Sequence, residues 1–563
     1  MMRFFVAGTM ALVLLETAGL MQPALAQTRG VGCDGAVVSK AGRSGPCTEL
    51  ARTIAGLLDG PEVARDHWGV AVTTLDGAPI YSLNEGQLFQ PASNAKLFTT
   101  AAAMALLGPE ITFETKVVAR GEFGGVETLT GDLVLIGGGD ANLSGRGIPY
   151  VAPKDRPKPA PGTPALQETS PLRYLEAMAD QVAATGLKVV NGDVVGDDTL
   201  FPWEPYAQDW TIDDAVWGYG APVSALTIND NQIKVTVTPA DTAGGPATAV
   251  VDPALPSYYM LDMSVTTGAK KSGSHVQMER ALGSKVLRVY GSIAVDSRPD
   301  EEEVAIHDPA EYAALALKGM LEARGIVVTG KARAQHRIPT DPDGFITQMK
   351  RPDRGDLVAG ADKRPQPIAC LVDAPPANNE RVLASHQSPK LLDDVTVTNK
   401  TSQNLHAELW LHHLGRQPPC GDGSIVAGAR VVRSFLESAG IDKDDFVFFD
   451  GSGLSGHDLV TPRATARLLQ YASTQPWFAD WKSSLPVGGA DGSLEARFAK
   501  DPLKGKVFAK TGTLGEARAL SGYVEGASGR TVIFSIMVGN HLPQTSGDRD
   551  VMDKIVAAIA AAN

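Results

Sequence analysis

Strand patterns at the two ends of the chain constrain its fold most strongly. Near the start, Trp68–Leu75 alternates apolar and polar residues, a turn signal follows at Asp76 and Gly77, and Pro79–Leu83 returns as a second strand. Three more strands are predicted near the other end, at Val507–Thr511, Leu520–Val524 and Thr531–Val538. These five strands can share one sheet, so the chain ends would form one domain with the middle inserted into it.

Helical patterns accompany these strands. Residues 49–59 and 549–561 predict helices, and Ser93–Leu107 predicts a strong helix because it is rich in alanine and leucine. A further helix is predicted near Asn404–Leu414. This mixture of strands and helices indicates an α/β fold class.

The middle of the chain, about residues 115–384, is rich in short strands and turns. A strand–helix–strand pattern is predicted at Glu303–His307, Ala310–Arg324 and Gly325–Val328. Residues 149–171 contain seven prolines and predict an exposed extended loop, and 338–380 is a second irregular stretch. With 563 residues, the chain is long enough for about three or four domains.

The first residues have the pattern of a secretory signal peptide. Arg3 precedes the apolar run Phe4–Leu15, and Ala24 and Ala26 form a small-x-small cleavage site. We therefore expect residues 1–26 to be an export signal. The alternative is a membrane anchor, although about 20 apolar residues are needed to span a bilayer.

Four cysteines remain after this segment, and an even number in an exported protein favours two disulfides. We expect the pairs Cys33–Cys47 and Cys370–Cys420, the first of which would close a short glycine-rich loop. Unpaired structural thiols are the alternative. Because the cysteine spacings include no CxxC, a zinc site is not expected.

Net charge and motif content exclude several classes of function. The chain carries 64 acidic and 51 basic residues, for a formal charge of −13, which argues against a nucleic-acid partner. It has no GxSxG elbow, no HExxH and no GxxxxGK[ST]. Three histidines crowd one predicted helix but lie on several of its faces, which favours a solvated helix over a metal site: His406, His412 and His413.

The strongest predicted helix begins with chemically suggestive residues. Ser93 and Lys96 are three positions apart, so their side chains lie on one helical face. The free N–H groups of a helix start favour a developing anion there, and a neutral lysine could accept the serine proton. The alternative is that Ser93 caps the helix and Lys96 is a surface residue.

Two later motifs complete a set. Ser402 and Asn404 open a second predicted helix, where capping is the alternative interpretation. Lys510, Thr511, Gly512 and Thr513 lie on a predicted strand, where they could hold a substrate carboxylate while the strand pairs with an extended peptide. A strand end followed by a turn is the alternative. The order S-x-x-K, S-x-N and K-T-G is the one found in penicillin-binding proteins and β-lactamases.

The whole sequence resembles the class C low-molecular-mass penicillin-binding proteins, the D-alanyl-D-alanine carboxypeptidase/endopeptidase family. Ser93 and Ser402 are 309 positions apart and Asn404 and Lys510 only 106, so a large insertion follows the first motif, as it does in that family. Other segments that carry the resemblance are Gly131–Asp140, Asp198–Phe201, Ala221–Leu226, Asn229–Asn231 and Asp450–Ser455.

The resemblance implies a domain organisation. Residues 27–114 and 385–563 would form a penicillin-recognising, transpeptidase-like catalytic domain, an antiparallel sheet flanked by helices. A large, strand-rich insertion would split it. Residues 115–136 and 221–384 would form inserted domain II, and residues 137–220 inserted domain III.

The resemblance also implies the roles of the site residues. Ser93 would attack the carbonyl between two D-alanines, and Lys96 would be its general base. Ser402 would pass a proton to the leaving amine, and Asn404 would hold the substrate backbone. The third motif would bind the terminal carboxylate and complete the oxyanion hole through Lys510, Thr511, Gly512 and Thr513. No cofactor or metal is implied.

The implied partners are peptidoglycan stem peptides in the periplasm, with β-lactam antibiotics as inhibitors that acylate Ser93. Oligomeric state and the balance of carboxypeptidase and endopeptidase activity stay open. A β-lactamase and a non-catalytic cell-wall binding protein are the alternatives. The sequence departs from the family at Gly456, where members carry an arginine that binds the charged end of the peptide side chain with an aspartate, matched here by Asp198. We therefore expect a changed or looser preference for a diaminopimelate-type side chain.

Overall fold

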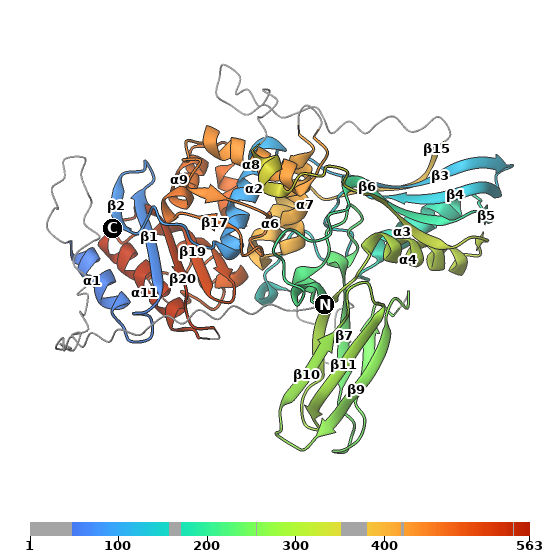
Figure 1. The fold of residues 1–563 in the computed structure, drawn as a ribbon, viewed down its shortest axis with the longest axis horizontal. Coiled ribbons are helices and arrows are strands. Elements are labelled where there is room, and N and C mark those ends of the chain that lie inside the picture. Colours follow the sequence, from blue (N-terminus) through green and yellow to red (C-terminus); the bar gives the residue numbers. More distant parts are fainter. Residues whose placement is uncertain are drawn as a thin grey trace, which may run out of the picture.

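The computed structural model describes residues 48–156, 170–254, 256–350, 380–417, 421–500, 502–543 and 545–563. Three bodies are visible in Figure 1: a domain built from both ends of the chain, a twisted sheet with two helices, and a projecting body of narrow strands. The expected signal peptide and all four cysteines lie outside the described residues, so both expectations stay predictions. In the part of the chain that is described, no helix has the length and apolarity needed to cross a bilayer.

The chain ends form one five-stranded antiparallel sheet, which confirms the arrangement expected from the strand patterns. Its order is β18-β19-β20-β1-β2, so the two early strands lie beside the three late ones. The strand bounds are β1 His67–Thr74, β2 Pro79–Leu83, β18 Val507–Thr513, β19 Ala517–Glu525 and β20 Thr531–Gly539.

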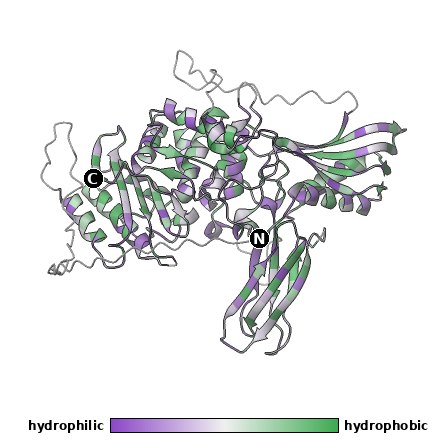
Figure 2. Ribbon diagram, in the orientation of Figure 1, coloured by the Kyte–Doolittle hydropathy of each residue, from purple (hydrophilic) through white to green (hydrophobic). Residues whose placement is uncertain are grey.

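Alternating residues of this sheet enter two different hydrophobic cores. On one face, Val70 and Val72 pack with α1 (Glu49–Leu58) and α11 (Gly547–Ala562). On the other face, Ala71 belongs to the core around α2 (Ala95–Leu106) and α9 (Pro462–Ser473). Hydrophobic residues are accordingly prominent along these strands (Figure 2). Because successive side chains of a strand point to opposite faces, the sheet divides the domain into two layers.

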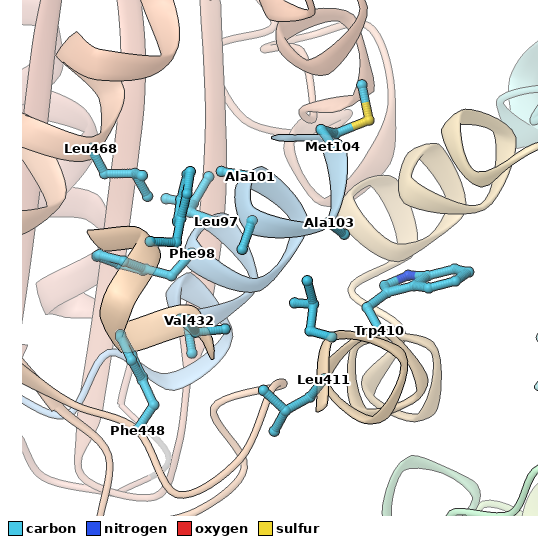
Figure 3. Packing of buried hydrophobic residues seen from close by; sticks show 14 of the residues in the cluster. Leu97, Phe98, Ala101, Ala103, Met104, Trp410, Leu411, Val432, Phe448 and Leu468 are labelled. Atoms are coloured by element: carbon cyan, nitrogen blue, oxygen red, sulfur yellow. The ribbon is translucent and has the colours of Figure 1, made fainter. Parts of the chain in front are cut away.

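The helix α2 (Ala95–Leu106) lies at the centre of the domain, and every residue except Ala105 is buried. Figure 3 shows Phe98, Ala103 and Met104 of this helix among side chains of the surrounding helices. Its small alanines allow close approach from several sides, and a helix that is apolar all round is buried all round. The helices that surround it are α6 Leu391–Thr401, α7 Asn404–Gly415, α8 Ile425–Ser438, α9 Pro462–Ser473 and α10 Phe478–Ser484.

The insertion contains a seven-stranded sheet and a separate body of two smaller sheets. The large sheet follows the path β13-β5-β4-β3-β15, with β6 and β14 joined to it, and α3 (Arg173–Ala184) and α4 (Pro309–Ala323) pack with it. Its strands are β3 Glu114–Gly124, β4 Thr128–Ile136, β5 Val189–Asn191, β6 Val194–Pro202, β13 Val327–Val328, β14 Ala332–Arg337 and β15 Glu380–Gln387.

The projecting body has the strand orders β10-β11-β9 and β12-β7-β8. Its strands are β7 Gln232–Thr238, β8 Thr248–Asp252, β9 Met260–Gly268, β10 Ser274–Glu279, β11 Val286–Ala294 and β12 Asp300–Ala305. A short helix, α5 (Phe345–Met349), and the strand pair β16 (Phe446–Val447) and β17 (Leu459–Val460) complete the regular elements that carry labels here.

The expected division of the insertion differs from this pairing. Residues 137–220 were expected to form a domain of their own, but β5 and β6 pair with β4 of the segment 115–136. The strand–helix–strand pattern is also wrong as one unit, because β12 pairs with β7 whereas β13 pairs with β5 of the large sheet. Local patterns located the two strands of this unit, but pairing between distant segments decides which sheet each strand joins.

Candidate active site

The three motifs occupy different elements that meet at one place. Ser93 lies in a 3-10 turn, Ala92–Asn94, directly before α2, and Lys96 is on the first turn of that helix. Ser402 ends α6 in a left-handed conformation (φ 61°), and Asn404 is the first residue of α7. Lys510 lies on β18. Ser402 thus closes one helix instead of opening the next, a small departure from expectation that forms a tight corner between α6 and α7.

Lys96 links the first two motifs. Its Nζ lies 2.9 Å from Ser93 Oγ, 2.6 Å from Asn404 Oδ1 and 2.7 Å from the Ser452 carbonyl oxygen. A neutral amine has two N–H donors and one lone pair. It can therefore donate to Asn404 and Ser452 while accepting the proton of the Ser93 hydroxyl. This contact set suits a general base without any rearrangement of the side chain.

Lys510 forms the corresponding link on the other wall. Its Nζ donates to Ser402 Oγ at 2.8 Å and to the Thr511 carbonyl oxygen at 2.9 Å. A methyl group on Gly512 would lie 2.6 Å from the Pro91 carbonyl oxygen and 3.1 Å from the Ser93 nitrogen. Glycine is required here because β18 passes so closely beside the start of α2.

A cavity of about 380 Å³ lies at this meeting point. Ser93, Ser402, Asn404 and Thr513 of the predicted residues line it. Thr511 is directed elsewhere, since its hydroxyl lies 2.7 Å from Ser493 Oγ. Asp214, Tyr219 and Gly453 also line the cavity and were not among the predicted site residues.

Asp198 is not brought to the cavity. It lies on β6 with only 2% of its surface exposed, accepts a hydrogen bond from Ser224 Oγ at 2.9 Å and pairs with His336 Nδ1 at 2.9 Å. The carboxylate that does reach the cavity wall is that of Asp214, on the 3-10 turn Asp214–Val216. Asp214 lies in a stretch of sequence that contains several other acidic and aromatic residues, so no motif distinguished it from its neighbours.

The segment Asp450–Ser455 packs against the first motif. Asp450 accepts hydrogen bonds from the backbone N–H groups of Ser452, Gly453 and Ser455, at 3.0, 2.6 and 2.7 Å. Gly453 has a φ of 81°, and a methyl group there would lie 1.8 Å from the Ala92 carbonyl oxygen. The resemblance pointed to this segment without a role, and its role here is to hold Ser452 and the turn that carries Ser93.

Burial controls the charge of both lysines. It lowers the pKa of Lys96 to about 8, against the opposing effect of the nearby carboxyl groups of Asp450, Glu408 and Asp458. Burial and then the neighbouring Lys96 hold the pKa of Lys510 well below its usual range. Burial together with Asp450 raises the pKa of Glu408 to about 8. A lysine poised near neutral pH is suited to exchange a proton with the serine.

The histidine-bearing helix α7 is buried, which corrects the expected solvated helix. His412 and His413 contact the carbonyl oxygens of Gly423 and Gly139, at 2.6 and 3.0 Å, and His406 pairs with two aspartates. The sequence cannot show that the insertion covers this helix. Within the described ranges, no group of three or more histidine, cysteine, aspartate or glutamate residues could hold a metal ion.

The fold is that of the penicillin-recognising class with a large insertion, and the family comparison shows a serine-type D-Ala-D-Ala carboxypeptidase. The family model of the D-Ala-D-Ala carboxypeptidase 3 (S13) family matches residues 50–344 and 369–562. The chain belongs to this family of serine-type carboxypeptidases.

Comparisons with individual proteins agree with this assignment. The chain is 33% identical over 509 residues to a D-alanyl-D-alanine carboxypeptidase of Actinomadura sp. (strain R39), covering 88% of this chain and 81% of that protein. It is 23% identical over 480 residues to the D-alanyl-D-alanine carboxypeptidase DacB of Haemophilus influenzae, covering 84% and 85%. The crystal structure of penicillin binding protein 4 from the same organism has the same fold, with a TM-score of 0.70, 21% identity and coverage of 90% and 98%.

Proposed function

We propose that Ser93 is the nucleophile of a D,D-peptidase that acts on the D-alanyl-D-alanine ends of peptidoglycan stem peptides, and that Lys96 is its general base. The observation that carries this proposal is the 2.9 Å contact between Lys96 Nζ and Ser93 Oγ at the wall of the cavity. Lys96 takes the hydroxyl proton as Ser93 Oγ bonds to the carbonyl carbon of the penultimate D-alanine.

The developing oxyanion lies between the backbone N–H groups of Ser93 and Thr513. The close approach of Gly512 to the Ser93 nitrogen supports this pairing of strand and helix start. The carbon–nitrogen bond then breaks, and the proton that Lys96 took from Ser93 reaches the leaving amine through the Ser402 hydroxyl, which contacts Lys510. Water hydrolyses the resulting ester and frees Ser93. Lys510 and Thr513 attract the terminal carboxylate of the substrate, while Asn404 holds its backbone.

A labelled penicillin tests these roles. Its lactam carbonyl and carboxylate mimic the peptide end, so we expect one stable covalent adduct per chain, lost in Ser93→Ala and retained in Ser493→Ala. Ser493 is the matched control because it is a serine near β18 that lies outside the proposed machinery. Rapid hydrolysis of the penicillin without a stable adduct would instead indicate a β-lactamase. No labelling of the wild type would indicate a binding protein without catalysis.

The region around Gly456 supports an altered preference for the peptide side chain. A methyl group on Gly456 would lie 2.7 Å from Asp209 Oδ2, and His457 Nδ1 lies 3.4 Å from the same oxygen. This arrangement puts the carboxylate of Asp209 beside Gly456, while the carboxylate of Asp214 lies on the cavity wall. It favours the ammonium group of a diaminopimelate side chain but offers its carboxylate no cation.

We therefore expect kcat/KM for peptides with a lysine side chain to be within a few-fold of the value for diaminopimelate peptides. Release of D-alanine from the two matched peptides, measured by coupled assay, gives the ratio. A strong preference for the diaminopimelate form would contradict this interpretation of Gly456. Introducing Gly456→Arg should raise the preference for diaminopimelate if the missing cation is its cause.

A further inference from the structure

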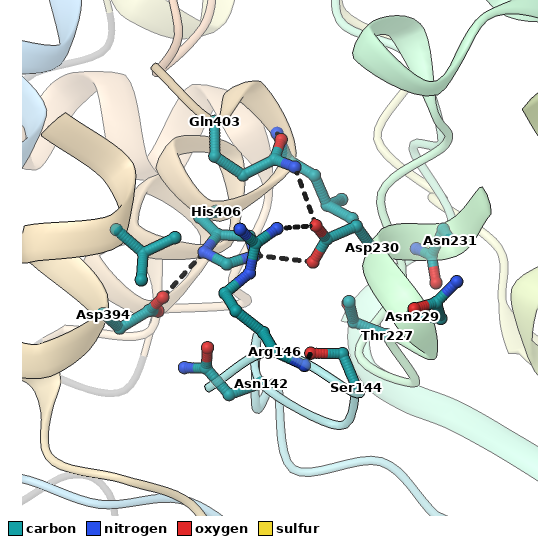
Figure 4. A network of polar contacts seen from close by, with 12 residues as sticks. Asn142, Ser144, Arg146, Thr227, Asn229, Asp230, Asn231, Asp394, Gln403 and His406 are labelled. Atoms are coloured by element: carbon teal, nitrogen blue, oxygen red, sulfur yellow. Dashed lines mark hydrogen bonds and ion pairs between the residues drawn. The ribbon is translucent and has the colours of Figure 1, made fainter. Parts of the chain in front are cut away.

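A buried ionic network joins the insertion to the back of the second motif. Asp230, in the 3-10 turn Asn229–Asn231, lies between Arg146 of the insertion and His406 of α7 (Figure 4). His406 Nε2 is 3.0 Å from Asp230 Oδ1, and His406 Nδ1 is 2.6 Å from Asp394 Oδ1 on α6. His406 and Asp230 are at most 4% exposed, so the contacts are shielded from water.

The backbone that presents Asp230 is unusual. Asn229, Asp230 and Asn231 all have left-handed φ values, of 51°, 55° and 54°. Three consecutive non-glycine residues in this region are unfavourable, and such strain persists only where the surroundings hold it. Asn231 provides that support, since its Nδ2 donates to the Pro222 carbonyl oxygen at 2.8 Å and its Oδ1 accepts from the Ile228 N–H at 2.9 Å.

The network reaches the second motif through the residues on either side of Asn404. Gln403 Nε2 donates to Asp230 Oδ2 at 3.1 Å, and Gln403 Oε1 accepts from the Leu405 N–H at 3.1 Å. His406 stands on the same first turn of α7 as Asn404. Because Asn404 Oδ1 is the 2.6 Å partner of Lys96, a shift of this turn would change the position of the lysine relative to Ser93.

We propose that Asp230 and His406 are positioning residues for the hydrolytic reaction, through which the insertion fixes the Ser402–Asn404 corner against Lys96. This inference rests on the proposed roles of Ser93, Lys96 and Asn404. The insertion then contributes to catalysis by positioning this corner, although Asp230 does not touch the bond that breaks.

The charges around His406 are consistent with a fixed ionic clamp. Asp394 faces it from α6 and Asp230 from the insertion, and Arg146 pairs with Asp230 from the far side. Asp140 with its partner His386 lies beyond Asp394, and Glu303 lies beyond Arg146. Burial alone would lower the pKa of His406, but the two aspartates raise it to about 9, so it carries a proton at neutral pH.

The insertion offers a matched control for a test of this clamp. His336 also lies between two aspartates, with Nδ1 2.9 Å from Asp198 and Nε2 3.2 Å from Asp308, and its pKa is raised to about 10. It contacts neither the second motif nor the cavity. His406→Gln and His336→Gln therefore each remove a histidine paired with two aspartates, fully buried at the corner and partly exposed away from it.

We expect His406→Gln to lower kcat for D-alanine release by about 10- to 100-fold with KM within about twofold, because small displacements of catalytic groups are costly. His336→Gln should leave kcat within about twofold and lower the melting temperature by no more than His406→Gln does, because its ion pairs are less buried. Equal kcat values for both variants and the wild type would overturn the proposal.

Gln403→Met keeps the test decisive if His406→Gln does not fold, because Gln403 is only partly buried and its loss leaves the ion pairs intact. It should lower kcat in the same direction by a smaller factor, and an unchanged kcat would count against the proposal. Labelling of Ser93→Ala by penicillin would show a different failure, that of the proposed catalytic roles. Loss of labelling in Ser93→Ala alongside a normal kcat in His406→Gln and Gln403→Met would overturn the positioning role alone.

Discussion

Replacing Lys96 by methionine is expected to lower the rate constant for acylation by penicillin by about 10²–10⁴-fold, the range for loss of a general acid–base group. Methionine keeps the unbranched shape that fills this buried position but cannot accept the Ser93 proton. Methionine also removes the donor to Asn404 Oδ1 and the Ser452 carbonyl oxygen, so the free energy of unfolding should fall by about 1–3 kcal/mol. Stopped-flow labelling together with circular dichroism measures both effects.

The pH dependence of the same rate constant provides the second half of this test. The neutral form of Lys96 is the active base, and burial lowers its pKa to about 8. The acylation rate should therefore rise with pH by about tenfold per unit well below pH 8 and level off above it. A rate in Lys96→Met that matches the wild type, or a wild-type rate that falls as the pH rises from 6 to 8, would contradict the role of Lys96.

Gly453→Ala is expected to have the second large effect, although the residue carries no functional group. The new methyl would lie 1.8 Å from the Ala92 carbonyl oxygen, and the φ of 81° is unfavourable for alanine. Accommodation must move the turn that carries Ser93. We expect a loss of at least about 2 kcal/mol in the free energy of unfolding and a loss of acylation larger than any loss of folded protein.

Gly319→Ala is the matched control for this substitution. Gly319 lies in α4, where an added methyl meets nothing within 4 Å, so the change should stabilise the protein by about 0.5–1 kcal/mol. Urea unfolding and penicillin labelling of the two variants separate the effects. Wild-type acylation in Gly453→Ala would show that the Asp450–Ser455 segment does not set the position of Ser93.

The catalytic sheet could be predicted from the sequence because its strands are short apolar runs, the first two of them separated by a turn signal. Val70 and Val72 face one core and Ala71 the other, so the middle of β1 is apolar on both faces, which is typical of a buried strand. The three motifs could likewise be found because their residue types and order are rare together. The three motifs could then be expected to meet at one site, because the two ends of the chain were predicted to form one domain.

The organisation of the insertion could not be predicted in the same way. Strands β5 and β6 join a sheet with partners from residues 114–136 and 327–337, and no local pattern encodes that pairing. For the same reason α7 was expected to be solvated, whereas the insertion contributes Asp230 and Gly139 as partners for His406 and His413. Burial by a distant segment is a tertiary property.

The expected position of the side-chain aspartate failed for a related reason. Asp198 matched the family by its place along the chain, but β6 directs it to Ser224 and His336, inside the insertion. Asp214 reaches the cavity from a 3-10 turn whose course the sequence pattern does not specify. Residue identity was informative about chemistry, but irregular backbone determined which carboxylate reaches the site.

The most direct test of the central claim is release of D-alanine from purified muropeptides, with the products identified by mass. The protein should release D-alanine from pentapeptide ends or split cross-linked dimers into monomers, and Ser93→Ala should do neither. His336→Gln, which alters only the insertion, should retain the activity. Undiminished D-alanine release or dimer cleavage by Ser93→Ala, or no cleavage of either substrate by the wild type, would contradict a serine D,D-peptidase that works through Ser93.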